Sequence, residues 1–72
     1  MKVYKFRERE NAEVWEISAR TKKQAWHELG EDYIYALELQ RSVRRKDRMG
    51  YAMEDFDFLS ESEGIRQTET SR

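Results

Sequence analysis

YIYALELQRSV, residues 33–43, can form either a strand or a helix, and the two outcomes give different folds. In a strand its larger apolar side chains would alternate with smaller or polar ones. The residues sharing the first face would be Tyr33, Tyr35, Leu37 and Leu39. In a helix the same side chains would point in nearly every direction around the axis, although Ala, Leu and Glu favour helix. We therefore expect a strand. The alternative is a hairpin packed on a longer or two-part helix.

Two further strands are expected before this stretch. Residues 2–8, KVYKFRE, and residues 13–19, EVWEISA, both alternate apolar and polar side chains, which is typical of half-buried strands. Glu10, Asn11 and Ala12 lie between them, which is short enough for a tight turn, and Asn tolerates a positive φ. The pattern predicts an antiparallel hairpin.

A short helix is expected after the hairpin. TKKQ, residues 21–24, matches the capping box, in which the Thr hydroxyl accepts from a backbone N–H and the Gln side chain returns to the cap. Ala25, Trp26 and Leu29 give the helix an apolar stripe. Gly30 stands where a left-handed residue would end it. So short a helix has to pack on the hairpin to be stable.

The C-terminal part is expected to hold a turn and a last strand. RRKDRMG, residues 44–50, is interpreted as a turn or protruding loop because it contains Asp47 and Gly50. A strand is expected at about residues 53–59, where phenylalanines alternate with aspartates. Residues 60–72 are rich in Ser, Thr and Glu and would form a flexible polar tail.

Together these elements predict one small α+β domain, residues 1–59, in the order strand, strand, helix, strand, strand (ββαββ). The helix would cover one face of an antiparallel sheet. A chain of 72 residues without cysteine depends on its apolar core, because it has no disulfide to stabilise it. The predicted core residues are Tyr4, Phe6, Trp15, Ile17, Ala25, Leu29, Leu37, Leu39 and Phe58.

The sequence has no apolar run long enough to span a bilayer, and its N-terminus becomes charged before a signal sequence could form. Small secreted proteins commonly carry disulfides, which this chain lacks. These features predict a soluble cytoplasmic protein that does not contact a membrane.

Catalytic chemistry has little support. His27 is the only histidine, and Glu28 and Glu31 could orient it as a general base, but no nucleophile motif accompanies it. One histidine without cysteine cannot supply a typical zinc ligand set, and phosphate-binding glycine loops are missing. We expect no catalytic residues, no metal and no cofactor, and therefore no enzyme.

A basic cluster is the strongest functional feature of the sequence. Its members are Arg41, Arg44, Arg45, Lys46 and Arg48. These cations could neutralise phosphates while nearby tyrosines stack on bases, so direct binding of DNA or RNA is one hypothesis. The net charge of −1 is unusual for a nucleic-acid module, and a solvated loop is the simpler interpretation.

An acidic cluster follows the basic one. Its members are Glu54, Asp55, Asp57, Glu61 and Glu63. Carboxylates along a strand can imitate a row of phosphates and bind a basic groove on a protein partner. They can equally prevent an edge strand from pairing with another chain. If both clusters belonged to one hairpin, Arg41 or Arg44 would pair across to Asp55 or Asp57 and fix the strand register.

Trp15 and Trp26 are expected to meet in the core, strand ring against helix ring. The alternative is that Trp26, at the edge of the helix stripe, is an exposed aromatic anchor for a partner.

VWEISARTKKQAWHELG, residues 14–30, resembles a pattern in small accessory proteins of phages and mobile elements, including anti-CRISPR-type inhibitors, in which a strand leads into a Thr- or Ser-capped short helix. The resemblance implies a non-enzymatic α+β inhibitor that binds a nucleic-acid-processing protein complex through charged surfaces. The functional hypothesis is thus an interaction protein with a protein partner, and the alternative is a small DNA- or RNA-binding protein. A homodimer is also compatible with so small a domain.

Overall fold

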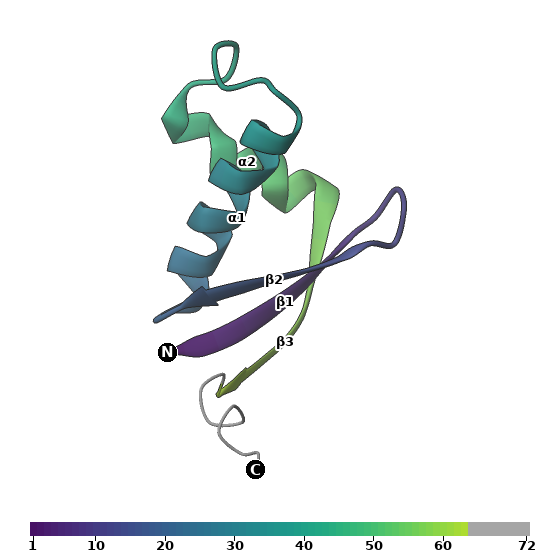
Figure 1. Cartoon of the computed structure of the whole chain (residues 1–72), viewed down its shortest axis with the longest axis vertical. Coiled ribbons are helices and arrows are strands. Elements are labelled where there is room, and N and C mark those ends of the chain that lie inside the picture. The colour runs from purple at the N-terminus through teal and green to yellow at the C-terminus, as the bar shows by residue number, and fades with distance from the viewer. Residues whose placement is uncertain (64–72) are drawn as a thin grey trace.

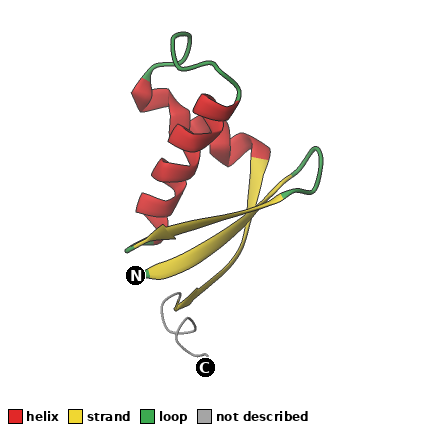
Figure 2. Ribbon diagram, in the orientation of Figure 1, coloured by secondary structure: helices red, strands yellow, loops and turns green. Residues whose placement is uncertain are grey.

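The computed structural model describes residues 1–63, which form a three-stranded antiparallel sheet and two helices (Figure 1). In chain order the elements are β1 Lys2–Glu8, β2 Val14–Ala19, α1 Lys22–Ala36, α2 Arg45–Asp55 and β3 Phe56–Glu63. The strand order is β2-β1-β3, and both helices lie to one side of the strands (Figure 2). The α+β class is confirmed. A second helix takes the place of one expected strand, so the order is closer to the alternative with a two-part helix.

The N-terminal hairpin is confirmed, with Tyr4 opposite Ile17 in the β1–β2 register. Its turn differs in one detail from the expected one. Ala12, rather than Asn11, has the positive φ, at 62°. The Asn11 side chain instead accepts a hydrogen bond of 2.9 Å from the N–H of Glu13, which is how Asn commonly stabilises a turn.

The start of α1 follows the expected capping box, except that the Gln24 side chain bonds to the residue before the cap. The Thr21 hydroxyl accepts from the N–H of Gln24 at 3.1 Å, as expected for an N-cap. The side-chain oxygen of Gln24 accepts from the N–H of Arg20 at 3.0 Å, one residue before the cap. Both contacts join the helix start to the end of β2.

α1 does not end at Gly30, as was expected, but continues past it. Its end is a Schellman motif, in which Leu39 N–H donates to the Ile34 carbonyl at 3.0 Å and Glu38 N–H to the Tyr35 carbonyl at 2.9 Å. Glu38 takes the left-handed position of this motif, with φ 60°, which glycine usually occupies. The sequence offered no glycine there to indicate the true helix end.

The expected strand at residues 33–43 is therefore wrong, and the reason is that α1 is buried on more than one side. Tyr33 faces the sheet, with its ring centroid 5.0 Å from that of Phe56. Ile34 is fully buried but lies outside the core cluster on the sheet. Tyr35 is 71% exposed. A helix with two covered sides carries apolar residues around much of its circumference, so no single stripe is visible in the sequence.

RRKDRMG, expected as a turn, forms the N-cap and the first half of α2, with Asp47 in its first turn. α2 crosses α1 at Gly30, where a Cβ would lie 2.6 Å from the carbonyl oxygen of Arg48 and 2.8 Å from the Cα of Met49. The two helix backbones can approach this closely only because Gly30 has no side chain. Gly50, by contrast, faces open space.

The core lies between α1, the inner face of the sheet and the end of α2. Its buried cluster consists of Tyr4, Phe6, Ile17, Ala19, Ala25, Leu29, Tyr33, Ala52 and Phe56, with Trp15, Trp26 and Phe58 partly buried against it. Of the expected core residues, Leu37 is exposed and Leu39 is only partly buried, because both belong to the linker after α1 rather than to a strand.

β3 begins at Phe56 and pairs with β1, opposite Glu8. A bulge in this pairing falls between Lys5 and Phe6 of β1. The strand continues to Glu63, beyond the expected end at residue 59, and the rest of the expected tail, residues 64–72, lies outside the described residues.

Candidate functional site

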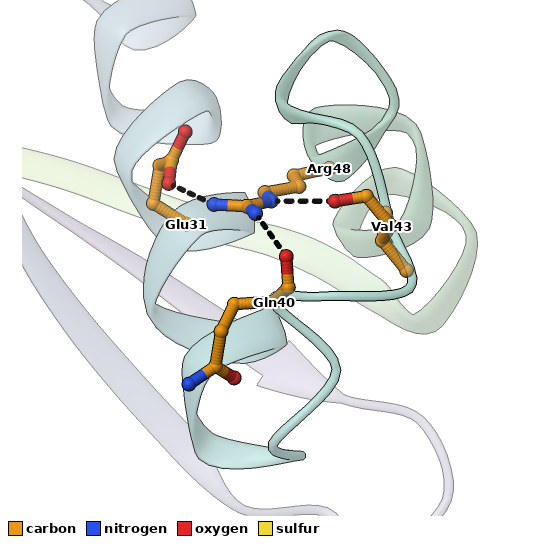
Figure 3. Close-up of polar contacts among 4 residues, drawn as sticks. All are labelled: Glu31, Gln40, Val43 and Arg48. Carbon is orange, nitrogen blue, oxygen red and sulfur yellow. Dashed lines mark hydrogen bonds and ion pairs between the residues drawn. The ribbon is translucent and has the colours of Figure 1, made fainter.

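The structure divides the basic cluster into an inner and an outer part. Arg48 belongs to the inner part, since its side chain is only 12% exposed. Its guanidinium donates to the Glu31 carboxylate at 2.8 Å, the Gln40 carbonyl at 2.9 Å and the Val43 carbonyl at 3.1 Å (Figure 3). Arg48 therefore fastens the linker between the helices to α1, and the planar fork of its guanidinium suits this task.

The outer part of the cluster is exposed, together with two apolar side chains at the end of α1. We call this set the linker surface; it consists of Tyr35, Leu37, Arg41, Arg44, Arg45 and Lys46. Among residues 1–63, none of its four cations forms an ion pair. The linker lies at the opposite end of the molecule from the end of β3 (Figure 1).

The cations of the linker surface stand where a helix disfavours them. Arg44 is the N-cap of α2 and makes no capping hydrogen bond with its side chain, while Arg45 and Lys46 are the next two residues. The positive end of the helix dipole repels cations, each at about 0.3–1 kcal/mol on an exposed surface. Glu54 and Asp55 lie in the last turn, where anions are disfavoured in the same way. Apart from Asp47 in the first turn, the charges at both ends of α2 therefore have the sign that destabilises the helix.

Most of the acidic cluster is occupied by internal contacts. Asp57 accepts from Arg9 Nε at 2.9 Å, and Glu61 pairs with Lys2 at 3.0 Å. The hydrogen bond to Glu61 and the negative charge of that residue raise the pKa of Lys2. Glu54 contributes its backbone carbonyl, which accepts from Arg9 Nη1 at 2.8 Å. The expected pairing of Arg41 or Arg44 with these aspartates is wrong, because neither arginine lies on a strand.

Asp55 accepts a hydrogen bond of 2.6 Å from the hydroxyl of Tyr33. Burial, and secondarily this hydrogen bond, raise the pKa of Tyr33 well above its ordinary value. Beside the pair is a hollow of about 360 Å³, lined by Glu8, Arg9, Glu10, Glu54 and Asp55. Arg9, which the sequence did not single out, is the only cation of this lining and joins the hairpin turn to β3.

Trp26 lies partly buried, with its ring centroid 4.6 Å from that of Phe6. Trp15 instead contacts the rings of Phe56 and Tyr33, at 5.4 and 6.2 Å. The two tryptophans thus flank the same core cluster through different partners. The hypothesis that Trp26 anchors a partner stays a prediction.

His27 lies on a second hollow, which sequence reasoning did not identify as a site. We call it the interhelix groove; its volume is about 470 Å³ and it is lined by Arg20, Thr21, Lys23, Gln24, His27 and Met49. Neither of the expected partners of His27 belongs to this lining, and Glu31 is bound to Arg48 instead. The helix crossing at Gly30 brings Met49 of α2 beside α1, and nothing in the local sequence indicates that contact.

Among residues 1–63, no group of three or more His, Cys, Asp or Glu side chains is placed to hold a metal ion. No helix in the same range is long and apolar enough to cross a bilayer. Comparison of the chain with protein-family models, curated proteins and solved structures gave no match to any of them.

Proposed function

We propose that this chain is a non-enzymatic interaction protein that binds an acidic surface of a protein partner through the linker surface. The observation that carries the proposal is the placement of Arg44, Arg45 and Lys46 at the N-terminus of α2. These charges oppose helix stability, and no described carboxylate pairs with them. A binding role explains their placement better than a structural one.

The side chains around these cations favour a protein as partner. Tyr35 is 71% and Leu37 46% exposed, at the start of the linker that carries the arginines. Tyr and Arg are enriched in the energetically important parts of protein interfaces, and Leu adds apolar contact area. Glu38 and Asp47 are exposed beside the same arginines and would repel a phosphate backbone.

The proposal narrows the expected partner-binding set. Asp55, Asp57 and Glu61 already contact side chains of the chain, whereas the outer cations form no ion pair within residues 1–63. Complementary charge acts mainly on association rate and specificity, so an acidic partner should associate faster at low salt. A nucleic-acid-processing protein complex remains the proposed kind of partner.

Affinity capture with the full chain and mass spectrometry tests the proposal, once in untreated and once in nuclease-treated lysate. The key variant is Arg44→Glu. The matched control is Arg7→Glu, the same charge reversal on β1 at an exposed position away from the linker. We expect Arg44→Glu to weaken binding of the purified partner severalfold, and Arg7→Glu to leave it unchanged. Equal binding by both variants would contradict the proposal. Loss of the captured material after nuclease treatment would support nucleic-acid binding instead.

A further inference from the structure

The interhelix groove has an apolar floor and a basic rim. Met49 is its apolar residue, and it is partly buried where α2 crosses Gly30. A thioether is flexible and polarisable, so it adapts to side chains of different shape. The aliphatic stems of Arg20 and Lys23 can extend the apolar floor while their charges stay in water.

The rim carries positive charges that no described carboxylate pairs with. Arg20 and Lys23 form no ion pair within residues 1–63, and the groove lining contains no carboxylate. Lys22, by comparison, lies 4.0 Å above the ring of Phe58 and does not line the groove. The two neighbouring lysines thus have different surroundings, one over the core and one on the groove.

We propose that the interhelix groove binds an acidic segment of the protein partner, with an apolar side chain of that segment against Met49 and its carboxylates on Arg20 and Lys23. This inference rests on the proposed function, because it takes the partner to be an acidic protein. It adds a second contact and the chemistry of the segment that occupies it.

Two observations favour a peptide segment over a phosphate group. Met49 has no group that could bind a phosphate. An apolar side chain placed against it would remove apolar surface from water, which is favourable. The groove is open and has a volume of about 470 Å³, which is far larger than a single phosphate group. Arg45 lies one helical turn before Met49 on α2, so the linker surface begins close to the groove and one partner can contact both.

Titration of the isotope-labelled full chain, followed by nuclear magnetic resonance, tests the inference. The probe is a short synthetic peptide of glutamate and leucine, and the control peptide has glutamine in place of glutamate. We expect shift changes at residues 20–27 and at the Met49 methyl with the first peptide, and much weaker binding of the second. Inorganic phosphate and a single-stranded oligonucleotide are titrated separately.

Lys23→Glu should weaken the acidic peptide severalfold, and so should Met49→Gln. Lys22→Glu is the matched control and should bind like the unaltered chain, since Lys22 does not line the groove. Thermal unfolding of each variant confirms that it is folded. Equal effects of the two lysine changes, equal binding of both peptides, stronger binding of the oligonucleotide or phosphate, or no shifts in the groove would each overturn the inference.

The two proposals fail in different ways. If the acidic peptide causes no shift changes in the groove but Arg44→Glu still weakens binding of the captured partner, only the groove assignment is wrong. If the acidic peptide binds the groove while Arg44→Glu leaves partner capture unchanged, the linker surface is wrong and the groove is retained.

Discussion

Gly30 of α1 faces the carbonyl oxygen of Arg48 in α2 so closely that a Cβ on Gly30 would lie 2.6 Å from it. The obstructing atoms belong to the backbone, so they cannot move aside as a flexible side chain would. Gly30→Ala should therefore separate the helices and lower the free energy of unfolding by about 1–3 kcal/mol, as overpacking commonly does. Chemical denaturation measures the loss.

Gly50→Ala is the matched control, because Gly50 lies within α2 with no atom in the way of a new Cβ. Alanine is the better helix former, so this variant should be more stable by up to about 1 kcal/mol. Opposite signs at the two glycines are the expected result. A neutral or stabilising Gly30→Ala would contradict the close crossing.

The same glycine shows how far the sequence could predict the fold. The hairpin and the start of α1 were predictable because their signals are local: alternation, a short turn and a Thr cap. Gly30 was interpreted by its common role at helix ends, whereas its actual role depends on a second helix that passes over it. α2 buries only Ala52 fully, so it has almost no apolar stripe to identify it from the sequence.

The candidate sites were predictable to a similar extent. The charged clusters are visible in the sequence, but whether a member is exposed or internally bound depends on tertiary contacts. Arg48 has the same chemistry as Arg45, yet only Arg48 meets Glu31 and the linker carbonyls. The interhelix groove combines Met49 with residues of α1 far from it in the chain, so no motif could indicate it.

Arg48→Met tests the fastening of the linker, since it keeps most of the aliphatic stem and removes the charge. The variant loses a partly buried ion pair and leaves the Gln40 and Val43 carbonyls without this donor. We expect a loss of about 2–3 kcal/mol in unfolding free energy. Glu31→Gln removes only the charge of one acceptor and should cost less. An equal loss in the two variants would mean that the carbonyl contacts contribute nothing.

The Tyr33–Asp55 hydrogen bond predicts sensitivity to alkaline pH. The folded state holds the Tyr33 proton more tightly than the unfolded state, because burial and the bond to Asp55 raise its pKa. Its contribution is complete below the unfolded pKa of about 10 and is lost as pH rises above that value, since the unfolded chain then binds fewer protons. Tyr33→Phe should cost about 1 kcal/mol at neutral pH and flatten the alkaline decline.

Denaturation at several pH values between neutral and strongly alkaline provides the measurement for Tyr33. Tyr51→Phe serves as the control, because Tyr51 is 44% exposed on α2. It should leave both the neutral stability and the alkaline slope almost unchanged. If Tyr33→Phe declined with pH as steeply as the unaltered chain, the buried hydroxyl would not be the group responsible.

Arg44→Asp separates stability from binding. An aspartate at the N-cap can accept from the free N–H groups of α2 and complement the helix dipole, which Arg44 does not do. The variant should gain about 1 kcal/mol, or about 4–8 °C in Tm for a domain of this size. Its affinity for the acidic partner should fall at the same time. A loss of stability with unchanged binding would mean that Arg44 serves the fold and not a partner.

Glu16 lies on β2, whose outer edge pairs with no other strand within residues 1–63. The bond from Glu8 N–H to the Glu13 carbonyl, 2.8 Å, sets the alternation along the hairpin, so the backbone groups of Val14, Glu16 and Ser18 point away from β1. Two copies that pair antiparallel through all three residues would place Glu16 opposite Glu16 of the other copy, and like charges directly opposite each other destabilise such pairing.

Glu16→Thr should therefore increase self-association in sedimentation experiments at equal concentration. Lys5→Thr is the control, because it breaks the same 3.7 Å ion pair with Glu16 but keeps the charge on the edge. Equal association by the two variants would show that the ion pair, and not the edge carboxylate, limits pairing.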